Sequence, residues 1–547
     1  MPADASLDAG SRMETMAACV RAGRHDEALA LAKAAIDDGV DHPLPLRIAA
    51  AALAQVGRFD EALILHERCV RLAPGDPAVR AGLAECLFAA QKPEAALEAW
   101  DGALLAAPAD VTLMTGKARV LIALGRAEEA ARLLRRALAA DPASLPAAFG
   151  LARLALEAGD LEEADALAQR LLARAPGQPD FLWLAARLAL GRGEPETAGA
   201  QLVRILDQPG LNPEQRAEVL LELGQALDAL GRPSEAFAAA VEGKAIQRGL
   251  YAARAAGRES ETAKLERLDA WFANADPAAW GPAPSLAASI DGEADAHAFL
   301  LGFPRSGTTL LEQALAGHPG VQTLEEAPTL AEPYAEFLSS AAGCVRLAGL
   351  DGAQADQWRA SYWGTVRAHG VDTARGGLFL DKAPAGTLTL PLIAKLFPKA
   401  RILFAVRDPR DVVLSCLRSA FQMNAMTYEF TSLEGTASCY RACMAMARTY
   451  RRVLALEIMD VGYENLVEDF EARLAAIATF LGLTQHPSML DIAATAAGRT
   501  VRTPSARQVR TGLNNAGVGR WRAYAQELAP VRTMLAPWIE TFGYPAA

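Results

Sequence analysis

A glycine-rich stretch at residues 302–310 is the part of this sequence best suited to chemistry. It reads GFPRSGTTL and lies between a short apolar run, 298–301, and a helical pattern that begins at Leu311. A loop between a strand and a helix turns successive backbone N–H groups toward one point, and the helix adds the positive end of its dipole. Such a loop binds a phosphate or sulfate group without specialised side chains.

The loop departs from the nucleotide-hydrolase pattern, which is G-x-x-x-x-G-K-[ST]. Thr308 stands at the lysine position, and Arg305 lies inside the loop. Without this lysine, and without an acidic strand end suited to magnesium, hydrolysis of a nucleoside triphosphate loses two of its usual charge stabilisers. A kinase acting on ATP is therefore the weaker alternative, and the loop suits another esterified anion.

Residues 304–310, PRSGTTL, resemble the 5′-phosphosulfate loop of sulfotransferases, as found in protein-tyrosine sulfotransferases and in bacterial repeat-fused relatives. The resemblance implies 3′-phosphoadenylyl sulfate as the co-substrate, and a reaction without a metal ion. It further implies that Arg305 neutralises charge on the bridging oxygen as the bond to sulfur breaks. The loop residues that it assigns to donor binding are Pro304, Arg305, Ser306, Gly307, Thr308 and Thr309.

A second strand pattern, 401–406, ends at Arg407 in the text RDPRD, and the helical pattern that follows contains Ser415. This segment resembles the strand and helix with which sulfotransferases hold the 3′-phosphate, so the resemblance assigns that role to Arg407 and Ser415. Arginine suits the role because its contact with phosphate is bidentate and permanently charged. The alternative is a structural ion pair between Arg407 and a nearby carboxylate.

Lys382 and Tyr463 also follow strand patterns, 377–380 and 457–461. Ligands bind at the carboxyl ends of parallel strands. The resemblance implies that Lys382 contacts the sulfuryl group, whereas a lone lysine at a strand end is more often solvated. It places Tyr463 near the nucleotide, and the alternative is a tyrosine that closes the core.

A basic segment near the C-terminus, 503–521, resembles the late segment that closes over the donor in the family. Basic side chains suit a segment that lies against phosphate groups. The resemblance implies donor contacts from Ser505, Arg510 and Arg520.

Sulfuryl transfer to an oxygen needs a base that takes the proton of the acceptor hydroxyl. The sequence HPGVQTLEE at 318–326 follows the loop helix. In protein-tyrosine sulfotransferases a comparable H-P is followed by E-E, whose second glutamate is the base, so the resemblance implies Glu326, with Glu325 as the alternative. Small-molecule sulfotransferases use a histidine; His318 and His369 could be proposed, but His318 matches a residue that is not the base.

The first half of the sequence repeats with a period of 34 residues, which is the tetratricopeptide period. Around each repeat stands the text G-R-x-x-E-A-L or a variant, with its first residue at Gly23, Gly57, Gln91, Gly125, Gly159 and Gly193, and a looser copy at Gly231. A second marker in the same register consists of Pro74, Pro108, Pro142 and Pro176. We expect two helices per repeat, with glycine in the positive-φ turn between them and proline after the second helix.

Small residues recur where paired helices must approach closely, at Ala50, Ala84, Ala118, Ala152, Ala62, Ala96, Ala130 and Ala164. The pattern resembles the tetratricopeptide family over residues 22–247. This implies a right-handed solenoid whose concave face binds proteins or peptides rather than performing chemistry. The array could hold an acceptor protein or form a homodimer.

We therefore expect a multidomain chain. An all-α tetratricopeptide-repeat solenoid should span 12–252, and a helical extension and linker 253–296. A P-loop-like α/β sulfotransferase domain with a central parallel sheet should span 297–547.

Composition limits the classes of partner. The formal net charge is -11, which argues against a surface adapted to nucleic acid. The seven scattered cysteines contain no C-x-x-C pair, and no apolar run is long enough to span a membrane. We expect reduced thiols in a cytoplasmic protein without a membrane partner.

The sequence as a whole predicts a sulfotransferase that uses 3′-phosphoadenylyl sulfate and an acceptor hydroxyl, a tyrosine of a protein or peptide. One alternative is sulfation of a glycan, a lipid or a small alcohol. The other is a repeat-based interaction scaffold whose transferase domain is inactive.

Overall fold

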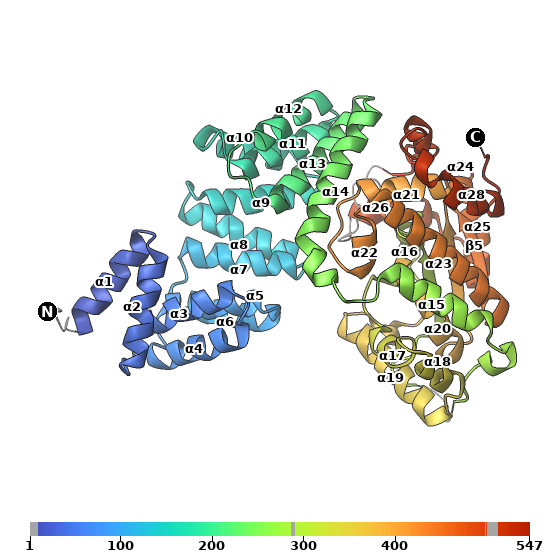
Figure 1. The fold of residues 1–547 in the computed structure, drawn as a ribbon, viewed down its shortest axis with the longest axis horizontal. Helices are drawn as coiled ribbons and strands as arrows, with labels where there is room; N and C mark the ends of the chain where they lie inside the picture. Colours follow the sequence, from blue (N-terminus) through green and yellow to red (C-terminus); the bar gives the residue numbers. More distant parts are fainter. Residues whose placement is uncertain (1–8, 286–289, 498, 500–511, 547) are drawn as a thin grey trace. The chain divides into compact units, whose positions relative to one another are not determined.

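The computed structural model describes residues 9–285, 290–497, 499 and 512–546. The chain divides into two compact units, Met1–Glu194 and Pro195–Ala547, which are described separately below (Figure 1). All seven cysteines are free thiols and are buried. Within the described residues, no helix is both long and apolar enough to cross a membrane.

The first unit is all-helical. Its helices are α1 (Ala9–Arg21), α2 (His25–Asp37), α3 (Pro43–Gln55), α4 (Phe59–Leu72), α5 (Pro77–Ala89), α6 (Pro93–Ala106), α7 (Val111–Ala123), α8 (Ala127–Ala140), α9 (Leu145–Ala158), α10 (Leu161–Arg174) and α11 (Pro179–Arg192).

The turns between paired helices confirm the expected repeat. Each marker glycine has positive φ, between 70° at Gly23 and 84° at Gly159, and Gln91 adopts the same conformation with φ of 61°. The second helix of each pair ends shortly before the marker proline, as α4 does before Pro74. The eight marker alanines are all completely buried, which confirms that they lie where helices approach closely.

Gln91 lets us predict the cost of a side chain at this turn. Replacing Gln91 by glycine should raise the free energy of unfolding of α5 and α6 by about 1 kcal/mol, because an L-residue is strained in the left-handed region. The measurement is amide hydrogen exchange of the intact protein at increasing urea concentrations, followed in the proteolytic fragments that contain α5 and α6, which gives the free energy of unfolding of these helices.

The matched control for this prediction is Gly125→Ala, one repeat later. A Cβ there has no atom within 4 Å, so only the φ of 75° opposes it. It should destabilise α7 and α8 by a similar amount. A loss of stability in Gln91→Gly would contradict the strain argument.

The second unit begins with helices α12 (Pro195–Leu206), α13 (Pro213–Ala229) and α14 (Pro233–Ala255), which continue the repeat pattern, followed by α15 (Glu261–Ala273). Helices α13 and α14 pack against each other, and α14 also packs against α21. Helix α15, which lies in the expected linker region, packs against α23 through a core that includes Leu268 and Phe272. The last repeat helices therefore belong to the same compact unit as the sheet.

The remaining described helices of this unit are labelled in Figure 1. They are α16 (Thr308–Ala316), α17 (Ala331–Phe337), α18 (Ala341–Ala348), α19 (Gly352–Ala368), α20 (Leu390–Leu396), α21 (Pro409–Arg418), α22 (Ala425–Glu429), α23 (Leu433–Val453), α24 (Tyr463–Glu468), α25 (Phe470–Leu481), α26 (Ile492–Ala497) and α28 (Arg532–Thr541). Short 3₁₀ segments include η3 (Pro384–Thr389) and η5 (Arg520–Tyr524).

The central sheet confirms the predicted parallel architecture. Its strands are β1 (Ala296–Gly302), β2 (Val321–Glu325), β3 (Leu378–Lys382), β4 (Arg401–Val406) and β5 (Glu457–Gly462). Every neighbouring pair is parallel, in the order β2-β3-β1-β4-β5. The chain builds β2 and β3 on one side of β1 and then crosses to build β4 and β5 on the other.

Both faces of the sheet are buried, as expected for parallel strands. On β1, Phe299 and Leu301 join the core formed with α15, α19, α20 and α23, whereas Ala298 and Leu300 join the core formed with α16 and α25. The course of the chain reverses between β1 and β4, and ligands of open α/β sheets bind at the carboxyl ends of strands at such a switch point. The loop at 302–310 and Arg407 follow these two strands.

Candidate functional site

The loop after β1 forms an open helix N-terminus. Gly307 is the N-cap residue of α16, with φ of 96°, and no side chain caps the first turn. A Cβ at position 307 would lie 2.4 Å from Cδ2 of Tyr463, so only glycine lets that ring pack on the loop. The first-turn N–H groups of a helix have no intrahelical partner, which makes this turn a candidate anion site. Ser306, Thr308 and Thr309 are buried around it.

The structure brings the loop into direct contact with the residues after β4. The Arg305 side chain donates a hydrogen bond from Nε to Oγ of Ser415, at 2.9 Å. Arg407 donates from Nη1 to the backbone oxygen of Arg305, also at 2.9 Å. The two segments lie about a hundred residues apart in sequence, and the sheet order is what makes them neighbours.

Arg407 lacks a carboxylate partner within 4.0 Å in the described part of the chain, which speaks against the structural ion pair considered above. Its Nη2 donates to the backbone oxygen of Gly517, its guanidinium lies 4.8 Å from the centre of the Tyr463 ring, and its buried Nε has no hydrogen-bond partner among the described residues. A buried guanidinium bonded only to carbonyl oxygens can still bind an anion. Tyr463 thus packs at this site.

Burial lowers the pKa of Arg305 to about 10, and the neighbouring Arg407 guanidinium acts in the same direction. Arg305 therefore stays protonated at neutral pH. The Arg407 guanidinium and the Arg305 side chain thus bring two positive charges to this end of the sheet, although the whole chain is acidic.

Asp411 positions the late segment, a role that the sequence did not reveal. Its carboxylate accepts hydrogen bonds from the backbone N–H groups of Gly519 and Trp521, both at 2.7 Å. Burial raises the pKa of Asp411 to about 6. These contacts hold Gly517 beside Arg407, so the described part of the late segment lies against the candidate site.

The three predicted residues of the late segment differ in outcome. Ser505 and Arg510 lie outside the described residues. Arg520 pairs with Asp228 of α13, which also binds Arg418 at 2.7 Å and accepts a hydrogen bond from Tyr524. The side chain of Arg520 therefore contacts a repeat helix rather than the glycine-rich loop at 302–310.

A cluster of three carboxylates surrounds Lys382 at the end of β3. The fully buried ammonium lies 2.9 Å from Oε1 of Glu325 and 2.9 Å from Oε1 of Glu326, and 3.6 Å from Glu312. Burial alone would lower the pKa of Lys382, but Glu312, Glu326 and Glu325 together raise it. Lys382 is not the solvated lysine of the alternative interpretation.

Glu312 is the member of this cluster that sequence reasoning missed. It lies on α16 and is almost completely buried, and burial raises its pKa despite the nearby Lys382. Its Oε1 accepts a hydrogen bond from Thr323 at 2.9 Å. The available signal was that Glu312 is the one charged residue in the text TTLLEQALA of the loop helix.

Glu326 differs from Glu325 in exposure and in backbone conformation. The Glu326 side chain is 50% exposed and that of Glu325 is 17% exposed. Within the described residues, only three non-glycine residues have positive φ: Gln91, Arg305 and Glu326, the last with 52°. Strained backbone is held in place only by its surroundings and tends to occur at functional sites. Two of the three strained residues lie in this candidate site.

The arrangement combines two functions at the carboxyl ends of neighbouring strands. The β1 loop, Arg407 and Ser415 can bind anionic groups. The cluster around Lys382 presents one accessible carboxylate, Glu326, that can accept a proton.

Comparison with known proteins gives matches over both halves of the chain. Residues 298–487 match the sulfotransferase family. Tetratricopeptide repeats match residues 18–77, 53–119, 121–188 and 179–204.

Individual relatives are distant. An uncharacterized protein of Aquifex aeolicus (strain VF5) is 26% identical over 251 residues, which cover 43% of this chain and 32% of the relative. Protein-tyrosine sulfotransferase 2 of Gallus gallus is 28% identical over 205 residues, which cover 35% of this chain and 52% of the relative. The chain thus spans about a third and about half of their lengths. A crystal structure of a tetratricopeptide repeat protein from Parabacteroides merdae ATCC 43184 matches 43% of this chain and 91% of its own, at 18% identity and a TM-score of 0.36.

Proposed function

We propose that this chain, which joins tetratricopeptide repeats to a sulfotransferase-family domain at residues 298–487, transfers the sulfuryl group of 3′-phosphoadenylyl sulfate to a tyrosine hydroxyl of a protein or peptide. The products are the sulfate ester and adenosine 3′,5′-bisphosphate. The proposal depends on the hydrogen bond between Arg305 and Ser415. This bond joins the two candidate anion-binding segments, which follow the carboxyl ends of the neighbouring strands β1 and β4.

The residues present fit this donor, which has phosphate groups at both its 5′ and 3′ positions. The uncapped turn at 304–309 would bind the 5′-phosphosulfate, and Arg407 with Ser415 would bind the 3′-phosphate. The buried Nε of Arg407 has no hydrogen-bond partner among the described residues, so its N–H group is available to donate to a bound anion. Tyr463 would pack beside the nucleotide. Contacts of Ser505, Arg510 and Arg520 with the donor, from the segment expected to close over it, stay predictions. When bound, the donor supplies an activated sulfuryl group.

Three side chains would act on the reacting groups. Glu326 would take the proton of the acceptor hydroxyl, and Arg305 would neutralise charge on the bridging oxygen as the bond to sulfur breaks. Lys382 holds Oε1 of Glu326. This contact would fix the carboxylate for proton transfer, beside the predicted contact of Lys382 with the sulfuryl group.

The tyrosine acceptor rests on the relatives rather than on the site. Protein-tyrosine sulfotransferases of Gallus gallus and Drosophila melanogaster are each 28% identical to this chain over about two hundred residues. The repeat array offers a surface on which a protein acceptor could bind.

The test is an assay of the full chain with donor labelled in the sulfuryl group. We expect label in a peptide that contains one tyrosine and none in its phenylalanine counterpart. Label in glycans or lipids alone would contradict the acceptor but not the reaction. No transfer to any pool, together with tighter binding of ATP than of adenosine 3′,5′-bisphosphate, would contradict the proposed function as a whole.

A further inference from the structure

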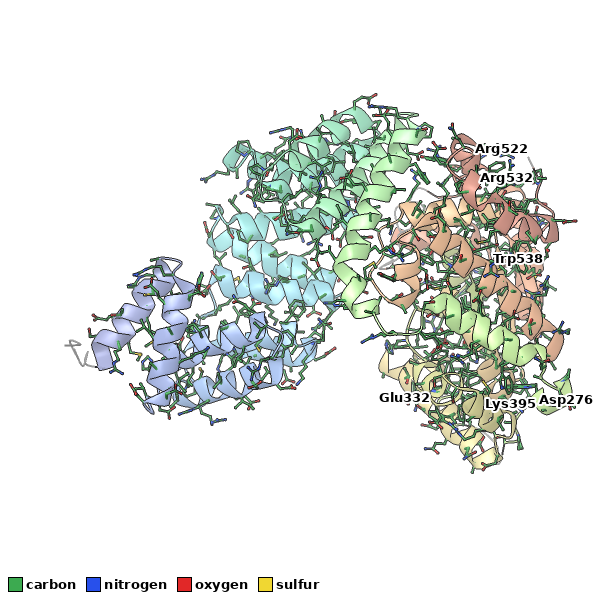
Figure 2. The ribbon with its side chains drawn as sticks, viewed as in Figure 1. Asp276, Glu332, Lys395, Arg522, Arg532 and Trp538 are labelled. Atoms are coloured by element: carbon green, nitrogen blue, oxygen red, sulfur yellow. The ribbon has the colours of Figure 1, made fainter. Side chains whose placement is uncertain are left out.

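A cavity of about 250 Å³ lies beside the carboxylate cluster, on the opposite face of the sheet from α16. Its walls come from β1, the end of β3, η3, α15 and the segment from Ala327 to Tyr334, which includes the first turn of α17. Figure 2 labels Glu332 in that turn. Ala327 and Ala383 line the cavity, and each directly follows a residue of the cluster, Glu326 and Lys382.

The cavity is largely apolar. Phe299 and Leu301 of β1 contribute to it, together with Leu330 and Leu388, and all four are buried. Its volume is below the range of about 300–1,000 Å³ that is typical for drug-sized ligands, so it suits a single ring or side chain.

Asp381 is the polar group that the cavity leaves unsatisfied. It is 1% exposed and lines the cavity, and within the described residues its Oδ1 has no hydrogen-bond partner. Its Oδ2, in contrast, accepts from the hydroxyls of Thr329 and Tyr362, both at 2.8 Å. Because the Tyr362 hydroxyl donates to Asp381, it accepts from Nε2 of His297. This chain of hydrogen bonds fixes Oδ2 and leaves Oδ1 without a partner among the described residues.

Charge favours one kind of ligand group. Burial raises the pKa of Asp381 to about 6, so that at neutral pH the cavity contains an ionised carboxylate without an ion pair in the described part of the chain. The other titratable groups in the wall are Tyr334, Glu261 and Lys264; the Lys264 ammonium pairs with the Glu261 carboxylate at 3.1 Å, so these two charges offset each other. His297 stays neutral, because burial lowers its pKa to about 3. A second anion would be repelled, whereas a donor or a cation would satisfy Oδ1.

We propose that this cavity binds the part of the acceptor next to its reacting hydroxyl, and that it selects an apolar group with a neutral or cationic hydrogen-bond donor over an acidic group. The inference rests on the proposed sulfuryl transfer, because the cavity adjoins the glutamate that would take the acceptor proton. It adds a specificity determinant, Asp381, that acts by contact with the acceptor.

The test uses the full chain, labelled donor and three small phenols as probes: tyramine, 4-ethylphenol and 4-hydroxyphenylacetate. For the unaltered protein we expect kcat/KM for tyramine to exceed that for 4-hydroxyphenylacetate by about tenfold or more. Asp381→Asn keeps an oxygen for Thr329 and Tyr362 but turns an amide N–H group toward the ligand, so this ratio should fall about tenfold. A ratio that does not change, or an unaltered protein that uses none of the phenols, overturns the proposal.

A blocking variant guards against a folding defect in Asp381→Asn. Ala331 is exposed and lines the cavity, so Ala331→Trp should lower kcat/KM for tyramine about tenfold or more by closing the wall. Ala335, one turn later and also exposed, is not part of the wall, and Ala335→Trp should leave activity unchanged. Equal effects of the two variants overturn the proposal. Binding of adenosine 3′,5′-bisphosphate by calorimetry separates this result from failure of the proposed function, in which the donor site itself does not bind.

Discussion

Replacing Glu326 by glutamine should lower kcat by about 10²–10⁴-fold, the range for loss of a general base, while binding of adenosine 3′,5′-bisphosphate stays unchanged. Glutamine keeps the size of the side chain and an oxygen for Lys382, but it cannot take the acceptor proton. Single-turnover transfer of labelled sulfuryl to the tyrosine peptide measures the chemical step, and calorimetry measures nucleotide binding.

Glu325→Gln is the matched control, because Glu325 contacts the same ammonium at the same distance of 2.9 Å. Glu325 lies within β2, opposite Lys382 in the sheet register, and its side chain is less exposed. We expect it to lower kcat far less than Glu326→Gln does. The reverse order of effects would move the base to Glu325 and leave the strained backbone of Glu326 without a catalytic explanation.

The features that the sequence predicted well depend on short segments. The positive-φ turn at Gly57 and the burial of Ala62 were predicted from the repeat within a single pair of helices. The strand before Arg407 was predicted from its own six residues. Local hydrophobic period and turn chemistry decide such elements, so they can be predicted without the tertiary structure.

The features that were missed depend on which segments the fold brings together. Glu312, Asp411 and Asp228 bind partners that lie from 11 to 296 residues away in sequence. Nothing local distinguishes a buried, paired carboxylate from an exposed one, because its burial follows from the packing of other elements. For the same reason the sequence placed Lys382 at a strand end but could not show its three carboxylate neighbours.

Replacing Arg407 by lysine should weaken binding of adenosine 3′,5′-bisphosphate by roughly 10–100-fold, because a hydrogen bond to a charged group contributes about 1.5–3 kcal/mol. Lysine keeps the charge but loses the planar donor set of the guanidinium. It also cannot reach both the Arg305 and the Gly517 backbone oxygens, which Arg407 holds together. Isothermal titration calorimetry of the full chain measures the change.

The specific contact with the 3′-phosphate is separated from loop positioning by a second ligand, adenosine 5′-phosphosulfate, which lacks that phosphate. If Arg407 binds the 3′-phosphate, the substitution weakens adenosine 3′,5′-bisphosphate much more than adenosine 5′-phosphosulfate. If it only positions the loop, both ligands weaken equally, and the assignment of Arg407 is wrong. Arg401→Lys, at the other end of β4 and partly exposed, is the matched arginine control and should change neither affinity. The comparison tests whether the Arg305 loop and Arg407, which are in contact, bind the 5′ and 3′ groups of the same nucleotide.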